Sequence, residues 1–411
     1  MKRSSAMRAL AVAALVALVC ASAQSLAQKP AAKISDGVVR IGLLLDMSSL
    51  YADLTGEGSA TAARMAIEDF GRSVLGAPIE LVYADHQNKA ELAAAKAREW
   101  YDADHVDVLA DVAASATALA ALEVARQKNR IIMFNGPGAT RLSNENCSPV
   151  SVHYTYDTYA MAVGTGRGVL KTGGDTWFFV TADYAFGHAL EKDTTEVITA
   201  EGGRVLGSVR HPLNAADLSS FLLQAQNSKA KVIGLANAGG DTINSIKTAN
   251  EFGISKTQKV AGLLVFINDI HALGLPVAKG MLLTEAFYWD MNPETRAWSR
   301  RYFERMKKMP NMIQAGTYSS VTHYLRAVRA AGTDDAAAVM AQMKATPIND
   351  FFVKNGRIRE DGRMLREMYV FEVKQPDEST YPWDYYKLKA TIPAEQAFLP
   401  AARSVCPLLK K

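Results

Sequence analysis

The stretch VVRIGLLLDM, residues 38–47, decides the fold class of this chain. Its apolar residues follow one another instead of alternating with polar ones, which predicts a strand that is buried on both faces. The next segment, residues 57–71, repeats apolar side chains at helical spacing from Ala60 to Phe70 and ends in a glycine. This pattern predicts an amphipathic helix. A buried strand followed by such a helix is the unit from which parallel α/β sheets are built.

The same unit recurs along the chain in two series. The first series adds expected strands at residues 79–85, 106–111 and 130–134 and helices at 89–101 and 117–128. The second has expected helices at 156–170, 189–201, 218–228 and 242–252 and strands at 175–183, 204–210, 231–237, 259–266 and 280–287. Helices at 293–308, 316–331 and 335–344 and short strands within 351–359 and 367–373 follow. Strands that alternate with helices pair in parallel through right-handed crossovers. The sequence therefore predicts two doubly wound α/β lobes.

The N-terminus has the pattern of a secretory signal peptide. A basic start precedes an apolar run from Ala9 to Val19, and small residues follow as far as Ala27; this order is typical of exported proteins. The run is shorter than the roughly 20 residues that a membrane span needs. We therefore expect residues 1–27 to be cleaved, after Ala23 or Ala27, and the mature protein to lie in the periplasm.

The charge of the mature chain argues against nucleic acid as a partner. Removal of Lys2, Arg3 and Arg8 with the signal peptide lowers the formal net charge from +4 to +1, which is too little to neutralise a row of phosphates. The mature chain keeps two cysteines, Cys147 and Cys406. In an oxidising compartment they are candidates for one long-range disulfide, and two buried free thiols are the alternative.

Sequence patterns of enzymes are missing from this chain. The seven histidines lack the spacing of metal ligands, and neither H-E-x-x-H nor G-x-S-x-G occurs. The phosphate loop G-x-x-x-x-G-K-[ST] is missing as well. These patterns would have indicated zinc, serine or ATP chemistry. We expect no catalytic activity, no cofactor and no metal.

Ligands of open parallel sheets bind beyond the carboxyl ends of the strands, where the following helices begin. The loops expected there are residues 46–58, 110–117, 134–142, 180–188, 235–241, 263–269 and 286–290. One of them contains NGPGAT, in which Gly136, Gly138 and Ala139 leave the backbone open and Thr140 adds a hydroxyl. On its own, this segment is either an ordinary turn or a cradle for a small anion.

Several of these segments, in this order, resemble the periplasmic substrate-binding proteins of ABC importers, of the leucine/isoleucine/valine-binding type. The segments are IGLLLDMSSLYADLTGEGSATAARMAIED, PGATRLS, TADYAFGHAL and KGMLLTEAFY. The resemblance implies two lobes that close on a ligand and then dock on a membrane permease. It implies crossings near His153, Phe287 and Arg366. The expected domains are a first lobe of residues 34–152 and 287–365, a second lobe of 153–286 and 366–390, and a tail of 391–411 packed on the first lobe.

The same resemblance implies which residues hold a ligand carboxylate. The backbone at Ala139 and the hydroxyl of Thr140 provide one pair of donors, and Ser115 provides a second hydroxyl. When the chain is aligned with the family, the family's serine falls on Ala114 and not on Ser115. The contact of this loop with the carboxylate can therefore also be made by backbone N–H groups alone. We expect a monomer that binds one small carboxylate.

Two positions depart from the pattern of amino-acid binders. The family places an acidic residue for the ligand ammonium where this chain has Leu264, and a tyrosine where it has Ala238. A buried ammonium without a carboxylate is costly, so the sequence disfavours an amino acid unless Asp241 or Asp269 takes that role.

Aromatic residues on the loops favour a ring-bearing ligand instead. Expected wall residues are Tyr51, Tyr184, Phe186, Phe266 and Tyr288, and Asn237 is expected to read a distal polar group. The sequence thus favours an aromatic acid of the benzoate, phenylpyruvate or hydroxycinnamate type. A branched-chain amino acid, an amide, and a role as a periplasmic ligand sensor remain the alternatives.

Overall fold

The first lobe is built on a six-stranded sheet with the order β2-β3-β1-β4-β5-β6. The computed structural model describes residues 33–409, so the expected signal peptide lies outside the described residues. The strands are β1 (Val39–Leu45), β2 (Ser73–Val74), β3 (Ala77–Asp85), β4 (Val108–Ala110), β5 (Ile131–Phe134) and β6 (Ser151–His153). All pairs except β2 with β3 are parallel. The continuous apolar run in β1 is explained by its place between β3 and β4, where it is buried on both faces.

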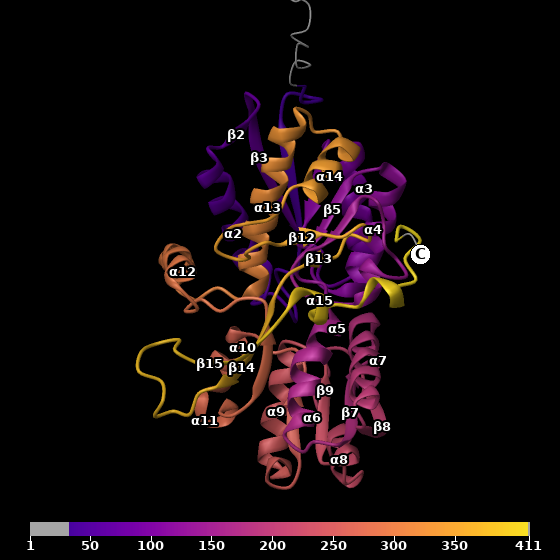
Figure 1. The fold of residues 1–411 in the computed structure, drawn as a ribbon, viewed down its shortest axis with the longest axis vertical. Helices are drawn as coiled ribbons and strands as arrows, with labels where there is room; N and C mark the ends of the chain where they lie inside the picture. Colours follow the sequence, from indigo (N-terminus) through magenta and orange to yellow (C-terminus); the bar gives the residue numbers. More distant parts are fainter. Residues whose placement is uncertain (1–32, 410–411) are drawn as a thin grey trace, which may run out of the picture.

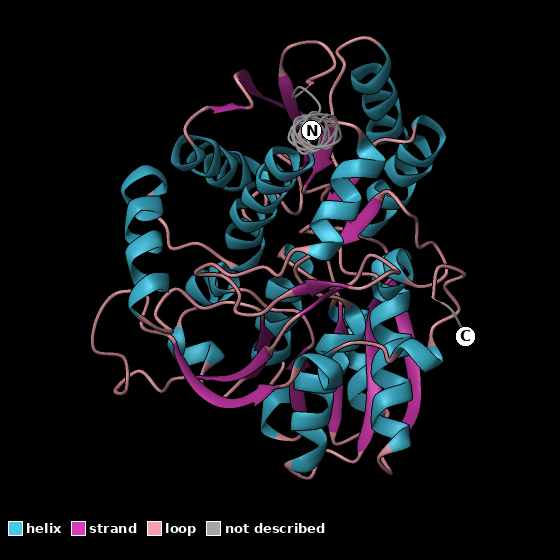
Figure 2. Cartoon of the chain, turned by 45° about the horizontal axis from the view of Figure 1, so that its top comes forward, coloured by secondary structure: helices cyan, strands magenta, loops and turns pink. Residues whose placement is uncertain are grey.

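Helices cover both faces of this sheet (Figure 2). They are α2 (Gly56–Phe70), α3 (Ala90–Asp102), α4 (Ser115–Lys128), α12 (Pro293–Met306), α13 (Met312–Ala331) and α14 (Ala336–Ala345), with the short 3₁₀ turn η1 (Thr140–Ser143) after β5. Helix α3 packs beside α4, and α13 lies against α2 and α14. A segment from the last third of the chain therefore completes the first lobe, as the colours of Figure 1 show.

The second lobe has a four-stranded parallel sheet with the order β10-β9-β7-β8. Its strands are β7 (Thr176–Ala182), β8 (Arg204–His211), β9 (Val232–Ala236) and β10 (Lys259–Gly262). Its helices are α5 (Thr158–Met161), the π-helical turn η2 (Ala162–Gly166), α6 (Arg167–Lys171), α7 (Ala185–Ala200), α8 (Ser219–Asn227), α9 (Gly240–Glu251), η3 (Ile254–Lys256), α10 (Ile267–Leu273) and α11 (Leu275–Ala278). The two lobes are stacked along the long axis of the molecule (Figure 1).

Three expected strands differ in the structure. The strand expected at 259–266 ends at Gly262, because the next residues turn into the space between the lobes. The strand expected at 280–287 is β11 (Leu282–Glu285), and it pairs antiparallel with β14 (Met368–Val373) and not with the parallel sheet. Strand β15 (Tyr386–Ile392) completes that three-stranded sheet. Within 351–359, only β12 (Arg357–Ile358) is a strand, and it pairs with β13 (Met364–Leu365).

The chain passes between the lobes three times: after β6, after β11, and between β13 and β14 (Figure 1). Two fully buried arginines lie at these crossings. Arg363 Nη1 donates to the Tyr156 carbonyl at 2.9 Å, and Arg366 Nη2 donates to the Phe352 carbonyl at 2.7 Å. The Arg366 guanidinium also stacks over the Phe352 ring at 4.0 Å. Arg366 Nη2 also donates to the Ala286 carbonyl directly after β11. Carbonyl groups from the first and the second crossing are thus bound by two cations of the third.

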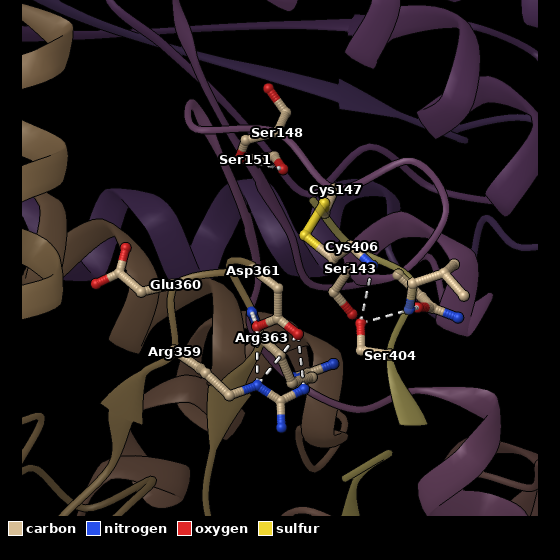
Figure 3. The surroundings of a disulfide bond; sticks show 12 residues. Ser143, Cys147, Ser148, Ser151, Arg359, Glu360, Asp361, Arg363, Ser404 and Cys406 are labelled. Carbon is tan, nitrogen blue, oxygen red and sulfur yellow. Dashed lines mark hydrogen bonds and ion pairs between the residues drawn. A yellow bond between two sulfur atoms is a disulfide. The ribbon is translucent and has the colours of Figure 1, made fainter. Parts of the chain in front are cut away.

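The C-terminal tail is attached to both lobes. Cys147 and Cys406 form a disulfide, which confirms the predicted pairing (Figure 3). Ser404 Oγ next to it donates to Asn144 at 2.9 Å. The tail also contains the short helix α15 (Ala394–Ala397) and the 3₁₀ turn η4 (Ala401–Arg403). Arg403 at the end of η4 forms a 2.9 Å ion pair with Glu196 of α7 in the second lobe. The tail therefore contacts the second lobe in addition to the first.

Residues 33–409 contain no helix with both the length and the hydropathy needed to cross a membrane. Nor does this part of the chain gather three or more His, Cys, Asp or Glu residues into a group that could hold a metal ion.

Candidate functional site

A cavity lies between the lobes, at the carboxyl ends of the parallel strands. It is bounded by loops after β1, β4 and β5 of the first lobe and after β7, β9 and β10 of the second. Its lining residues are Tyr51, Leu54, Thr55, Ala113, Ala114, Ser115, Gly136, Pro137, Gly138, Tyr156, Tyr184, Phe186, Ala238, Leu264, Phe266 and Ile313. Six of the seven loops that the sequence indicated meet here; the loop after β11 does not.

The start of helix α4 supplies hydrogen-bond donors to the cavity. The first intrahelical bond is donated by Ala118 to the Ala114 carbonyl at 3.1 Å, so the earlier N–H groups of the helix have no partner within it. Ser115 is the first helical residue, and its buried Oγ accepts the Ala139 N–H at 3.1 Å. The hydroxyl proton of Ser115 can still be donated. A helix N-terminus with a hydroxyl donor is suited to an anion.

The backbone of the loop before α4 is strained. Ala114 has φ 64° and ψ 147°, a conformation that is almost restricted to glycine and costs roughly 1 to 3 kcal/mol for other residues. Asp111 in the same loop also has a positive φ, 45°. Strain of this kind persists where the surrounding structure imposes it, and it is concentrated at functional sites.

Two glycines of NGPGAT are required by close packing. A Cβ on Gly138 would lie 2.7 Å from the Tyr156 ring and 2.9 Å from the Phe186 ring. A Cβ on Gly136 would lie 2.9 Å from the Asp111 carboxylate. Both distances are shorter than van der Waals contact allows. Because these positions lack a Cβ, the Tyr156 and Phe186 rings can pack against Gly138, and the Asp111 carboxyl group can pack against Gly136.

The loop that carries Tyr51 is held by Asp46 at the end of β1. The Asp46 carboxylate accepts the backbone N–H groups of Ser49 at 2.8 Å and Tyr51 at 2.9 Å and the Ser49 hydroxyl at 2.6 Å. One buried carboxylate thus fixes a turn directly after the strand, as acidic residues commonly do. The turn directs the Tyr51 ring into the cavity.

The second lobe forms an aromatic and aliphatic wall. Tyr184 and Phe186 follow β7, with ring centroids 6.0 Å apart. Phe266 precedes α10, where Asp269 accepts its backbone N–H at 2.9 Å. The Phe266 ring meets Tyr156 edge to face at 6.2 Å, a favourable arrangement for aromatic pairs. Flat apolar walls of this kind bury a ring more effectively than they bury a charge.

The lobes meet directly over the cavity. The Tyr51 and Tyr184 hydroxyls lie 2.5 Å apart, and burial raises the pKa of both phenols. At the rim, Asn268 Nδ2 of α10 donates to the Asp53 carbonyl at 3.2 Å. The cavity has a volume of about 30 Å³, which leaves room for about two water molecules and is well below the roughly 150 Å³ that holds benzene. A larger ligand requires the lobes or the tyrosine pair to move apart.

Six of the ten predicted ligand residues line this cavity: Tyr51, Ala114, Ser115, Tyr184, Phe186 and Phe266. Leu264 and Ala238, the two positions that depart from the amino-acid binders, line it as well. The structure thus gathers the apolar positions of both lobes around one space.

The structure places Thr140 and Ala139 outside the cavity lining. Thr140 Oγ1 donates to Asp193 of α7 at 2.7 Å, and its N–H donates to Thr158 Oγ1 at 3.1 Å. The Ala139 N–H is directed to Ser115 Oγ. Both donors of Thr140 are therefore used between the lobes, and the expected contact of this hydroxyl with a ligand carboxylate does not match its position.

The side chains of Asn237 and Tyr288 also form their hydrogen bonds away from the cavity. Asn237 Nδ2 donates to Ser245 at 3.2 Å, and its Oδ1 accepts from Thr242 at 2.7 Å. The Tyr288 hydroxyl donates to the Trp383 carbonyl at 3.0 Å, against the three-stranded sheet. Both side chains support the fold of the second lobe and lie outside the cavity lining.

Neither acidic residue that could have held an amine lines the cavity. Asp241 accepts the Asn214 N–H at 3.0 Å, and Asp269 caps α10. Burial raises the pKa of Asp269 to about 7. None of the lining residues from the described chain carries a charge. The cavity therefore combines uncharged N–H and O–H donors on one side with aromatic rings on the other.

Five lining residues were not expected from the sequence: Leu54, Thr55, Ala113, Tyr156 and Ile313. The first three lie in loops expected at this edge, but Tyr156 lies at the first crossing and Ile313 at the start of α13. Gly136, Pro137 and Gly138 belong to NGPGAT, the segment that the sequence had indicated. An aromatic residue directly at a crossing is a signal that could have indicated Tyr156, since crossings border the space between lobes.

The chain belongs to the periplasmic binding protein family, whose model matches residues 38–379. Members of this family are solute receptors of ABC transporters. This family membership confirms the resemblance seen in the sequence, and it implies a small-molecule ligand, a permease partner and a periplasmic location. The chain matches no curated protein.

Three solved structures illustrate the similarity. A periplasmic binding protein from Burkholderia mallei is 57% identical, with a TM-score of 0.90 over 92% of this chain and 100% of that one. A branched chain amino acid ABC transporter periplasmic ligand-binding protein from Burkholderia xenovorans is 39% identical, with a TM-score of 0.81 over 90% and 100%. An ABC transporter solute binding protein from R. palustris, in complex with benzoate, is 19% identical, with a TM-score of 0.78 over 90% and 99%. The last similarity concerns the fold alone.

Proposed function

We propose that this protein is the receptor of an ABC importer for a small aromatic carboxylate of the benzoate, phenylpyruvate or hydroxycinnamate type. The single observation that carries the proposal is the composition of the cavity. It has a helix N-terminus and the Ser115 hydroxyl at one end, aromatic rings at the other, and no acidic side chain among its described lining residues. The helix N-terminus and the Ser115 hydroxyl suit an anion, and the aromatic rings suit a ring-bearing ligand.

An amino acid fits this lining less well. Its ammonium would be desolvated next to Leu264 and Phe266 without a carboxylate, which is costly. The benzoate complex named above, and another in which a related fold holds p-hydroxybenzoic acid, show that the fold accommodates such ligands in other proteins. The name of the Burkholderia xenovorans protein keeps a branched-chain amino acid as the competing ligand class.

The proposed mechanism is binding by lobe closure. The ligand carboxylate first meets the α4 N-terminus in the open form, where Ala114 and Ser115 present their backbone and hydroxyl. The second lobe then closes on the ligand ring, with Tyr51 and Tyr184 on its two sides. Closure brings surfaces of both lobes into a fixed relation that a permease can recognise. We expect the receptor to act as a monomer.

A thermal-shift series with matched ligand pairs tests the proposal. Benzoate and benzamide differ in charge, and leucine and 4-methylpentanoate differ in the amine. A ligand at a hundred times its dissociation constant adds about 2.7 kcal/mol to the folded state, which such a measurement detects. We expect a shift with benzoate or a larger aromatic acid and none with benzamide. A shift with leucine that 4-methylpentanoate does not reproduce would contradict the proposal, because it would show that the site holds an ammonium.

A further inference from the structure

Asp111 is a fully buried carboxyl group without a charged partner. It directly follows β4 at the carboxyl edge of the first sheet, and its side chain has no measurable exposure. Within residues 33–409 neither carboxyl oxygen has a hydrogen bond of good geometry, although the Ser59 and Thr317 hydroxyls and the Gly136 N–H lie close enough to lower its pKa. Buried carboxylates normally accept several hydrogen bonds or pair with a cation, because an isolated buried charge is strongly unfavourable. Asp111 therefore needs an explanation that the fold alone does not supply.

The position of Asp111 places it directly behind the cavity wall. A Cβ on Gly136 would lie 2.9 Å from Asp111 Oδ1, 3.3 Å from Thr55 Cγ2 and 3.6 Å from Ala113 Cα. Gly136, Thr55 and Ala113 all line the cavity. The carboxyl group is thus separated from the cavity by the glycine backbone, on the side where α4 begins and where the proposed ligand carboxylate would lie.

The groups that face Asp111 offer no compensating charge. They are the hydroxyls of Ser59 on α2 and Thr317 on α13, the backbone of Gly136, and the phenol of Tyr156. Tyr156 is the titratable group among these neighbours, and burial holds its pKa well above its usual value, so it stays neutral. Burial also raises the pKa of Asp111, to about 7, against the weaker opposing effect of the two hydroxyls and the Gly136 N–H.

We propose that Asp111 makes ligand binding depend on a proton: the neutral carboxyl admits an anion to the cavity, and the ionised carboxylate repels it. Two negative charges on either side of one glycine, in a site that excludes water, destabilise each other strongly. Above neutral pH, binding of an anion therefore takes up one proton, which converts the Asp111 carboxylate to the acid. This inference rests on the proposed function, because it takes the ligand to be a carboxylate.

The test is the dissociation constant of benzoate, measured calorimetrically as a function of pH. Benzoate itself stays ionised across the range. We expect the dissociation constant to rise about tenfold between about pH 6 and about pH 8, as one group with a pKa near 7 requires. In Asp111→Asn the dependence disappears and tight binding persists at high pH. If that variant does not fold, Asp111→Ser replaces it.

Asp107 provides a matched control at the other end of the same strand. It precedes β4, is also buried, and has its pKa raised to about 7 by burial, but it accepts the Arg40 N–H at 2.8 Å at the edge of the sheet away from the cavity. Asp107→Asn should keep the tenfold dependence on pH. A pH-independent affinity in the wild type, or an unchanged slope in Asp111→Asn, overturns the inference.

A second measurement separates this inference from the proposed function. In protein with ¹³C-labelled aspartate carboxyls, NMR should show several resonances that titrate near pH 7, because burial also raises the pKa of Asp107 and Asp269 to about 7. The one that is lost in Asp111→Asn, and kept in Asp107→Asn, belongs to Asp111. If benzoate and the other aromatic acids bind at no pH, the proposed ligand class is wrong, and the resonance decides the state of Asp111 by itself. A midpoint below about pH 5 overturns the inference. A ligand with an amine that binds more tightly as the pH rises would contradict the proposed ligand class but not the role of Asp111, because an ionised Asp111 attracts a cation.

Discussion

The hydroxyl of Thr140 in the first lobe donates a hydrogen bond to Asp193 of α7 in the second lobe, across 2.7 Å. Asp193 also accepts the Thr158 hydroxyl at 2.5 Å, and Thr140 Oγ1 accepts the Tyr159 N–H at 3.1 Å. The threonine that the sequence indicated as a ligand anchor therefore takes part in a buried network between the lobes. Substitution of Thr140 should therefore weaken the contact between the lobes more than it weakens ligand binding in the cavity.

Replacing Thr140 by alanine should lower the stability of the closed protein. Loss of a hydrogen bond to a buried acid costs about 1.5 to 3 kcal/mol, and urea denaturation without ligand measures it. We expect the dissociation constant of benzoate to change less than in a variant of the cavity itself. Thr140→Ser, which keeps the hydroxyl, is the control. A large loss of affinity at unchanged stability would instead return Thr140 to the ligand site.

Replacing Ser115 by alanine should weaken carboxylate binding directly. A charge-assisted hydrogen bond contributes about 1.5 to 3 kcal/mol, so the dissociation constant of benzoate should rise roughly tenfold to a hundredfold. Calorimetry at fixed pH measures this dissociation constant, and Ser115→Thr is the control variant that keeps a hydroxyl. Unchanged affinity in Ser115→Ala would remove this residue from the site.

Replacing Leu264 by glutamate should reverse the preference of the cavity for charge. The new carboxylate would repel an aromatic acid and would pair with an ammonium. We expect benzoate to bind at least about tenfold more weakly, and leucine to gain affinity. Leu264→Gln has a similar shape without the charge and separates electrostatics from packing. Equal benzoate binding in the wild type and the glutamate variant would show that Leu264 does not face the ligand.

Replacing Tyr184 by phenylalanine should loosen the closed form. The hydroxyl pair with Tyr51 spans the lobes at 2.5 Å, and a neutral hydrogen bond contributes about 0.5 to 1.5 kcal/mol. Small-angle X-ray scattering without ligand should show a larger radius of gyration, or a larger fraction of open molecules. Tyr83→Phe, whose hydroxyl lies on the exposed side of β3, should leave the scattering unchanged. Identical curves for Tyr184→Phe and the wild type would exclude this role.

Replacing Cys406 by serine should destabilise the protein through the loss of a long cross-link. The disulfide joins residues separated by 259 positions, and removal of such a bond typically costs about 2 to 5 kcal/mol. The melting temperature should fall, and a reducing agent should lower that of the wild type to a similar value while leaving the variant unaffected. If the two proteins unfold alike under oxidising conditions, the tail is held by other contacts such as Arg403 with Glu196.

Much of the site could be predicted because parallel strands bring their carboxyl ends to one edge. Once the strands were recognised, the loops with Tyr51, Ser115, Tyr184 and Phe266 had to meet. Asn237 and Tyr288 were misplaced for a different reason. Each lies next to a loop of this edge, but their side chains are used by Thr242 and the Trp383 carbonyl, and a linear pattern does not show which way a side chain points.

The sequence by itself determined the alternation of buried strands and amphipathic helices, and with it the two lobes, the edge proposed to bind a ligand and the family. Only the tertiary structure decided which polar groups face the cavity. Thr140 and Asp193 are 53 positions apart, and Asp111 meets Gly136 only because β4 and β5 lie side by side. Backbone conformation follows from local patterns, whereas the state of a buried polar group depends on which distant segments surround it, since burial and hydrogen bonding set its energy together.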